Sequence, residues 1–155
     1  MKATKILFPT DFSSCSDAPL EYATALARDM DASLLIVHVE EPPWAYRGGE
    51  LYYGASDPTV AELETMLAKI VPTDPAVPCE HRLLSGDAAR TIVELAAEEE
   101  VELIVLGTHG RTGFRRLLMG SIAEAVVRTA PCPVLTLRER HKESQPQEQT
   151  VAFGR

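Results

Sequence analysis

The residues with the clearest chemical potential lie in one glycine-rich segment of the chain. A short apolar run, Leu103 to Leu106, leads directly into it. The segment contains four glycines and a serine: Gly107, Gly110, Gly113, Gly120 and Ser121. Glycine lets the backbone approach a ligand closely, and a helix beginning after Gly120 would present unpaired N–H groups with partial positive charge. A strand, a glycine loop and a helix start in this order predict a site for a phosphate group.

The spacing of these glycines differs from two common phosphate motifs. No Gly-Lys-Ser/Thr triplet follows them, which excludes a Walker loop, and they do not match G-x-G-x-x-G. The alternative is that the glycines only punctuate a loop after a strand. Three basic residues inside the segment favour phosphate binding over this alternative: Arg111, Arg115 and Arg116. His109 either contacts a phosphate or lies exposed, and the sequence favours neither.

Ser121 also has two candidate roles. With Glu124 three residues later it matches a capping box, so its hydroxyl would cap the following helix instead of meeting a phosphate. The backbone N–H groups of Ser121 and Ile122 would serve a ligand in either case.

Strand and helix patterns alternate along the chain. Five apolar runs predict strands: Ile6 to Phe8 ending at Pro9, Leu34 to Val39, residues 79–84, Leu103 to Leu106, and Val134 to Leu137. Four apolar stripes predict helices: Leu20, Ala23, Ala27 and Met30 after a cap at Ser16; Val60, Leu63, Leu67 and Ile70 after a cap at Asp57–Pro58; Ile92, Leu95 and Ala96 after Gly86 and Asp87; and Ile122, Ala125, Val126 and Thr129. This alternation predicts an α/β fold with a parallel sheet.

Parallel sheets bind ligands at the carboxyl ends of their strands, where the strand order reverses. If the first and fourth strands are neighbours there, Pro9, Thr10 and Asp11 would face the glycine segment across one crevice. Asp11 would accept hydrogen bonds from a ribose hydroxyl, or it would simply form an Asx-turn. Val39, at the end of the second strand, would offer backbone groups to an adenine edge, or it would be core.

Composition excludes several classes of protein. The chain has 155 residues, which fits one domain, and a formal net charge of −8, which disfavours nucleic acid and anionic membranes as partners. Its three cysteines form no disulfide framework and no metal pair. The N-terminal segment resembles a first strand and not a secretory signal. These features predict a cytoplasmic protein.

No catalytic constellation stands out. The histidines are scattered and form no metal pair: His38, His81, His109 and His141. His38, inside an apolar strand, is expected to be hydrogen-bonded and half-buried. Asp11 and His109 are the candidates for an enzymatic role, and neither is a convincing base, so any hydrolysis is expected to be slow.

Three further segments lie outside the main pattern. Residues 40–56 form a loop whose aromatic residues would either cover a ligand or a partner or pack on their own loop: Trp44, Tyr46, Tyr52 and Tyr53. The run Glu98–Glu100 is expected to be a solvated face. Residues 139–155 are polar and are expected to be a mobile tail.

Four segments of the chain resemble the universal stress protein family: KILFPTDFS, LLIVHV, GDAARTIVELA and GTHGRTGFRRLLMGSIAEAVVRTAPCPVL. The resemblance covers residues 2–138. The last segment fits the pattern of the ATP-binding subgroup, G-x2-G-x9-G-[ST], at Gly107, Gly110, Gly120 and Ser121.

The resemblance implies a Rossmann-like, open five-stranded parallel sheet of order 3-2-1-4-5 with helices on both faces, over residues 1–138. It implies a homodimer through the last strand: Val134, Leu135, Thr136 and Leu137. It also implies ATP, with Mg²⁺ or Mn²⁺ held mainly by the phosphates. By position, Pro9, Thr10 and Asp11 would lie near the adenine and ribose, and Val39 would meet the adenine through its backbone. The residues implied around the phosphates are Gly107, Thr108, His109, Gly110, Arg111, Thr112, Gly113, Gly120, Ser121, Ile122 and Ala123.

Three functions follow from these observations. The first is an ATP-binding stress-response or regulatory protein whose nucleotide state is sensed through the dimer. The second is a slow ATPase or a nucleotidyl-transfer enzyme, which the absence of a catalytic constellation disfavours. The third is a dimeric interaction protein with a vestigial nucleotide site, which the glycine pattern disfavours.

Overall fold

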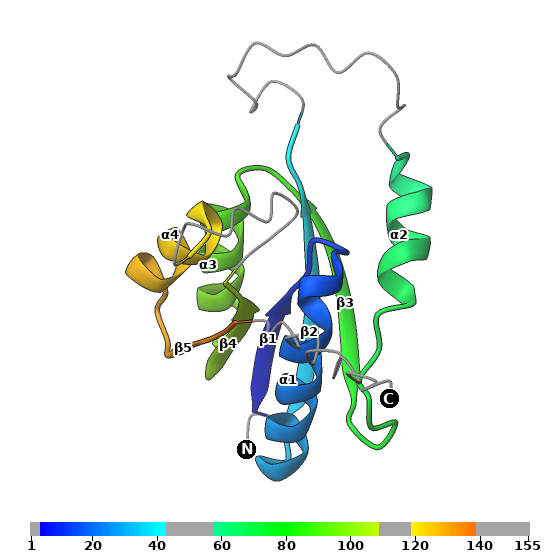
Figure 1. The fold of residues 1–155 in the computed structure, drawn as a ribbon, viewed down its shortest axis with the longest axis vertical. Coiled ribbons are helices and arrows are strands. Elements are labelled where there is room, and N and C mark those ends of the chain that lie inside the picture. The colour runs from blue at the N-terminus through cyan, green and yellow to red at the C-terminus, as the bar shows by residue number, and fades with distance from the viewer. Residues whose placement is uncertain (1–3, 43–57, 109–118, 139–155) are drawn as a thin grey trace, which may run out of the picture.

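The computed structural model describes residues 4–42, 58–108 and 119–138 (Figure 1). The strands in these ranges are β1 (Lys5–Pro9), β2 (Ser33–Glu40), β3 (Cys79–Ser85), β4 (Leu103–Gly107) and β5 (Val134–Leu137). The helices are α1 (Asp17–Asp29), α2 (Val60–Ala68), α3 (Ala88–Glu98) and α4 (Ser121–Thr129), and a short 3-10 helix, η1 (Ser14–Ser16), precedes α1. Every predicted strand is therefore present.

The strands form one parallel sheet of order β3-β2-β1-β4-β5. This confirms the fold that the sequence predicts. From β1 the chain moves outward to β2 and β3, and it then returns to place β4 on the other side of β1. The strand order thus reverses between β1 and β4, and the carboxyl ends of both strands lie at one edge of the sheet.

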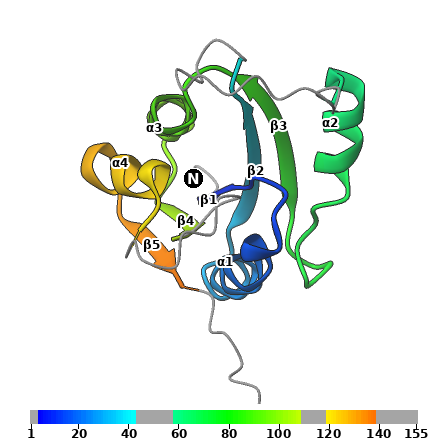
Figure 2. The same cartoon turned by 45° about the horizontal axis from the view of Figure 1, so that its top comes forward.

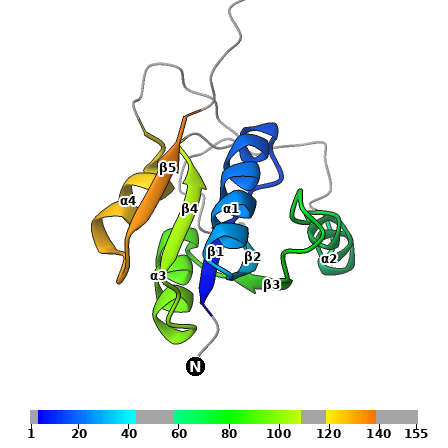
Figure 3. The ribbon, with the colours of Figure 1, turned by 90° about the horizontal axis from the view of Figure 1, so that it is seen from below.

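Helices cover both faces of the sheet (Figure 2 and Figure 3). One face packs against α3 and α4 in a cluster that includes Leu35, Val37, Ile92, Ile104 and Val126. The other packs against α1 and α2 in a cluster that includes Ile6, Phe8, Ala27, Ile36 and Leu67. Successive strand residues alternate between the two clusters because side chains point to opposite faces of a strand. The six residues from Leu34 to Val39 are all buried, as a strand covered on both faces requires.

The predicted helical stripes of α1 and α2 are partly wrong. In α1, Ala23 and Ala27 are buried as predicted, but Met30 is 40% exposed because it lies beyond the last helical residue, Asp29. In α2, Leu63 and Leu67 are buried, but Val60 is 56% exposed at the first helical position. A residue of a predicted stripe is therefore buried only where the helix continues and the sheet lies beneath it.

The predicted cap of α2 is also wrong, because Thr59 caps this helix and Pro58 precedes the cap. The Thr59 hydroxyl accepts a hydrogen bond from Glu62 N at 3.3 Å. The Glu62 carboxylate accepts one from Thr59 N at 2.7 Å, and this bond is the main reason that the pKa of Glu62 is lowered. The two bonds form a capping box.

The acidic run at the end of α3 is not purely a solvated face. Glu98 and Glu100 are exposed, as predicted. Glu99 instead pairs with Lys5 at 2.6 Å and lies 3.7 Å from Arg82. The end of α3 lies near the start of β1, so this carboxylate links helix and sheet.

Among the described helices, none has the length and apolar character that a membrane span requires.

Replacing Thr59 by Ala should destabilise the protein by about 1 kcal/mol, because the replacement removes the hydroxyl that accepts from Glu62 N. Urea unfolding measures the change in the free energy of unfolding. Thr65 is the matched control, since it lies within the same helix and its hydroxyl donates to Ala61 O. Thr65→Ala should be neutral or stabilising, because Ala is the better helix former. Equal losses in both variants would contradict the capping role.

Candidate functional site

The structure places the carboxyl ends of β1 and β4, which the two predicted walls of the crevice would follow, at the same edge of the sheet. β1 and β4 pair in parallel with Ile6 opposite Leu103 and Leu7 opposite Ile104. Both strands therefore end at this edge, β1 at Pro9 and β4 at Gly107. Because this is where the strand order reverses, the edge has the geometry at which parallel sheets bind ligands.

The loop after β1 is held by its own polar side chains. Thr10 is buried, and its hydroxyl accepts a hydrogen bond from Phe12 N at 3.1 Å. Asp11 Oδ1 accepts hydrogen bonds from Ser13 N at 2.9 Å and from Ser13 Oγ at 2.6 Å. This is the Asx-turn that the sequence offered as one role of Asp11. A contact of Asp11 with a ribose stays a prediction. The turn fixes the position from which the Asp11 carboxylate would make that contact.

The same loop contacts β2 through a histidine. His38 Nδ1 lies 2.8 Å from Thr10 O, and the His38 ring lies against the Phe12 ring with 4.2 Å between centroids. The expected hydrogen bond of His38 is confirmed, although the residue is buried and not half-buried. No sequence pattern predicts that Phe12 belongs to this loop structure or that its φ is a left-handed 64°.

The opposite wall is closed by a backbone contact between β4 and α4. Thr108 is buried; its N–H donates to Leu137 O at 2.9 Å, and its carbonyl accepts from Gly120 N at 2.6 Å. A Cβ on Gly120 would lie 3.2 Å from Thr108 O, tighter than most such contacts. The φ of Gly120 is −70°, which any residue adopts. Glycine is thus favoured at 120 by close approach and not by backbone conformation. Residues 109–113 of the predicted phosphate site lie outside the described residues.

The predicted capping box at Ser121 is wrong. Gly120 occupies the N-cap position of α4, without a side-chain hydrogen bond, and Ser121 is the first helical residue. Glu124 is then one residue too far along the helix for the box, and its carboxylate pairs with Arg128 at 2.7 Å. The competition between capping and ligand binding at the Ser121 hydroxyl is therefore removed.

The buried side of α4 also differs from the prediction. Ala123 and Val126 are buried, whereas Ile122 is 40% exposed and Thr129 is exposed. Ala123 and Val126 join the core cluster shared with α3, so contact with α3 as well as with the sheet sets the orientation of the helix. Ser121 and Ile122 consequently lie on the outer side of the first turn.

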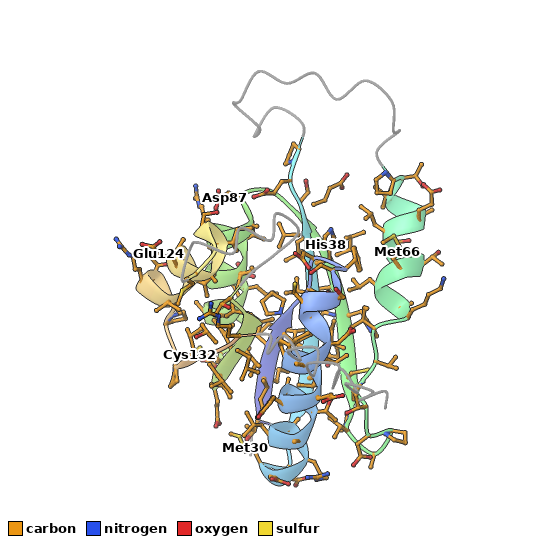
Figure 4. The ribbon with its side chains drawn as sticks, viewed as in Figure 1. Met30, His38, Met66, Asp87, Glu124 and Cys132 are labelled. Carbon is orange, nitrogen blue, oxygen red and sulfur yellow. The ribbon has the colours of Figure 1, made fainter. Side chains whose placement is uncertain are left out.

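The start of α3 contrasts with the start of α4 in its electrostatics. The Asp87 side chain accepts from Arg90 N at 2.9 Å, and Glu41 Oε1 accepts from Ala88 N at 3.2 Å. Two carboxylates therefore already satisfy N–H groups in the first turn of α3, and Figure 4 shows Asp87 at that end of the helix. The cap of α4 is a glycine, which places no carboxylate on the first N–H groups, and the acid in its first turn, Glu124, pairs with Arg128.

Val39 lies at the end of β2, two residues before Glu41 in the sequence. Its side chain is buried in the core cluster on the α3 side, which agrees with the core alternative. The contact of its backbone with an adenine stays a prediction.

Across the described ranges, no three His, Cys, Asp or Glu side chains gather as a metal site would need.

Replacing Ser121 by Ala should leave the free energy of unfolding unchanged, because the Ser121 hydroxyl does not cap α4. Asp87→Ala is the comparison at a true cap, and it should cost about 1 kcal/mol. Urea unfolding of both variants measures the difference. A loss for Ser121→Ala as large as that for Asp87→Ala would restore the capping box.

Comparison with known proteins identifies the family. Residues 2–138 match the universal stress protein family. Universal stress protein MJ0531 of Methanocaldococcus jannaschii is 34% identical over 143 residues, which cover 90% of this chain and 84% of that protein. The universal stress protein from Archaeoglobus fulgidus in complex with dAMP has a TM-score of 0.65 and 25% identity, over 88% of this chain and 98% of that chain. A universal stress protein in complex with cAMP has a TM-score of 0.65 at 22% identity, with the same coverage. The chain belongs to the universal stress protein family.

Proposed function

We propose that this chain is an ATP-binding regulatory protein of the stress response, with the nucleotide bound at the edge where β1 and β4 end. The observation that carries the proposal is the start of α4. Its cap is a glycine held 2.6 Å from Thr108 O, beside the end of β4. A helix start of this kind, without a carboxylate cap, favours an anion.

The proposed phosphate site uses backbone N–H groups. The first hydrogen bond of α4 runs from Glu124 N to Gly120 O at 2.9 Å. The N–H groups of Ser121, Ile122 and Ala123 precede it and are oriented along the helix axis. Together with Gly107, Thr108 and residues 109–113, they would surround the phosphates. Mg²⁺ or Mn²⁺ would be held mainly by the phosphate oxygens.

The charges at this edge favour one orientation of the bound nucleotide. Glu41 and Asp87 lie at the start of α3, where they would repel a polyphosphate. The phosphates are therefore expected at α4. The base and ribose would lie toward β1 and β2, near Pro9, Thr10, Asp11 and the backbone of Val39. The dAMP complex of the Archaeoglobus fulgidus relative supports an adenine nucleotide as the class of ligand.

In the proposed function, the protein senses ATP and hydrolyses it slowly at most. Among the described residues at the edge, Asp11 is already engaged in its turn through Oδ1. His109, the other candidate, lies outside the described residues. We further propose that residues 1–138 form the nucleotide-binding domain, that residues 139–155 form a tail, and that the protein works in the cytoplasm.

Binding of Mg-ATP should raise the melting temperature, and ATP at 100 times Kd should add about 2.7 kcal/mol of stability. Gly120→Val should abolish this shift, since its side chain would displace Thr108 O or obstruct the phosphates. Asp87→Ala is the matched control, because it alters the cap of the neighbouring helix and should keep the shift. Thermal melts with and without Mg-ATP, and a phosphate-release assay, provide the measurements.

The outcomes separate the three functions. A shift with slow phosphate release supports the proposal, whereas a shift with fast release favours an enzyme. No shift in the wild type would indicate a vestigial site. Normal ATP binding by folded Gly120→Val would show that the phosphates are placed wrongly.

We also propose that two copies pair through β5. In the described sheet β5 is an edge strand. Pro133 O accepts from Ile104 N at 3.0 Å, and Leu137 O accepts from Thr108 N at 2.9 Å. Because backbone groups alternate in direction along a strand, those of Val134 and Thr136 point away from β4 toward the open edge. A second β5 would bind these groups.

Thr136→Pro should therefore convert a dimer to a monomer, because proline removes an N–H that faces the open edge and no bond to β4. Thr136→Val keeps the N–H and should remain dimeric. Sedimentation or light scattering measures the mass of each variant. A dimer that survives in folded Thr136→Pro would place the interface elsewhere. Charge at Leu135 is a poorer test, since this side chain packs on the core cluster shared with α1.

A further inference from the structure

Thr10 is fastened to β2 through both of its backbone polar groups. Its N–H donates to Val37 O at 2.9 Å, and its carbonyl oxygen lies 2.8 Å from His38 Nδ1. Because a carbonyl oxygen can only accept, Nδ1 carries the proton and donates it. The residue that begins the loop after β1 is thus fixed from the neighbouring strand.

Phe12 is held by the same histidine. Its ring lies 4.2 Å from the His38 ring, with 35° between the planes. Its φ of 64° lies in the left-handed region, which a bulky side chain adopts only at a cost in free energy. Such a conformation persists only when its surroundings hold it, and here the His38 ring and the Thr10 hydroxyl do so. Asp11 lies between these two anchored residues.

The arrangement is buried, with His38 7% and Thr10 6% exposed. Figure 4 shows His38 near the carboxyl end of β2, beside the start of α1. The β2 residues on the same face, Leu34 and Ile36, are aliphatic core. A third aliphatic residue at 38 would complete an apolar strand face. A histidine there supplies a donor and a ring to the loop instead.

We propose that His38 is a positioning residue for the nucleotide site: its Nδ1–H bond to Thr10 and its contact with Phe12 hold the loop in the conformation that binds the nucleotide. This inference rests on the proposed function, in which Thr10 and Asp11 face the base and ribose. His38 itself lies behind the loop and acts through it.

The expected consequence is a change in affinity. Without the bond to His38, the loop would sample other conformations, and the fraction competent to bind would fall. The apparent Kd rises in inverse proportion to that fraction. A loss of stability alone would lower the melting temperature without changing the affinity of the folded protein.

The test is calorimetric titration of the full chain with Mg-ATP. His38→Phe keeps a ring but has no donor, and it should weaken binding about tenfold by reducing the competent fraction to about a tenth. His38→Asn places an amide N–H near the position of Nδ1 and should stay within about threefold of the wild type by retaining most of that fraction. This partial rescue distinguishes the hydrogen bond from the volume of the side chain.

His81 provides the matched control. Its Nε2 lies 2.7 Å from Ile70 O, so it makes the same kind of bond between a strand and a connecting segment. His81 lies on β3, away from the loop after β1. His81→Phe should lower the melting temperature and leave the affinity for Mg-ATP unchanged.

Two readouts do not need the nucleotide. Amide hydrogen exchange at Phe12 and Ser13 should be faster in His38→Phe than in the wild type and unchanged in His81→Phe, because their N–H groups bond within the loop. The ¹⁵N shifts of the His38 ring should show a protonated Nδ1.

Each outcome decides the proposal. Weaker binding in His38→Phe alone, with faster exchange at Phe12, supports it. Wild-type affinity in His38→Phe, or an equal loss in His81→Phe, overturns this role and leaves the proposed function standing. No binding by the wild type overturns both. If His38→Phe does not fold, Phe12→Leu keeps the hydrogen bond but loses the ring contact, and unaltered affinity in this variant overturns the role.

Discussion

The parallel pairing of β1 with β4 is the constraint on which the rest of the structure depends. Two neighbouring strands whose connections leave in opposite directions along the sheet send their right-handed crossovers to opposite faces. This places α1 and α2 over one face and α3 and α4 over the other. It also leaves the edge between β1 and β4 uncovered by either connection. The layered core and the proposed binding edge are thus two results of one strand pairing.

Along that edge, the N-termini of α3 and α4 occupy equivalent places in the fold but differ in charge. Both α3 and α4 begin after a strand of the same sheet, and both therefore present helix N-termini there. Carboxylates from Glu41 and Asp87 occupy one of them, and a glycine caps the other. A chain with a formal net charge of −8 can in this way keep one local position suited to an anion.

The fold was predictable because the strands carry strong apolar runs and the helices alternate with them. Strand order followed from the family resemblance, since short apolar runs do not specify which strands are neighbours. Errors occurred at helix ends and faces. Ser121 was predicted as a cap because a serine three residues before an acid fits the motif, but Gly120 has the extended backbone that the cap position needs. Ile122 is exposed because contact with α3 helps to orient α4, and no periodicity within α4 contains that contact.

For the site, the sequence predicts the glycines and Asp11 as ligand-binding residues, but it does not predict what holds Gly120 and Asp11 in place. The proposed role of His38 depends on the carbonyl of Thr10 in the loop after β1, and the left-handed φ of Phe12 has no sequence signal. Both are tertiary facts.

The hydrogen bond from Gly120 to Thr108 has a consequence for how this protein can change over evolution. It joins the residue after β4 to the cap of α4, so the framework fixes both ends of the segment between them. The entropy of closing a loop grows only slowly with its length. Insertions, deletions and substitutions between residues 108 and 120 should therefore cost the framework little, so that ligand preference can diverge among descendants while the sheet and helices are inherited intact.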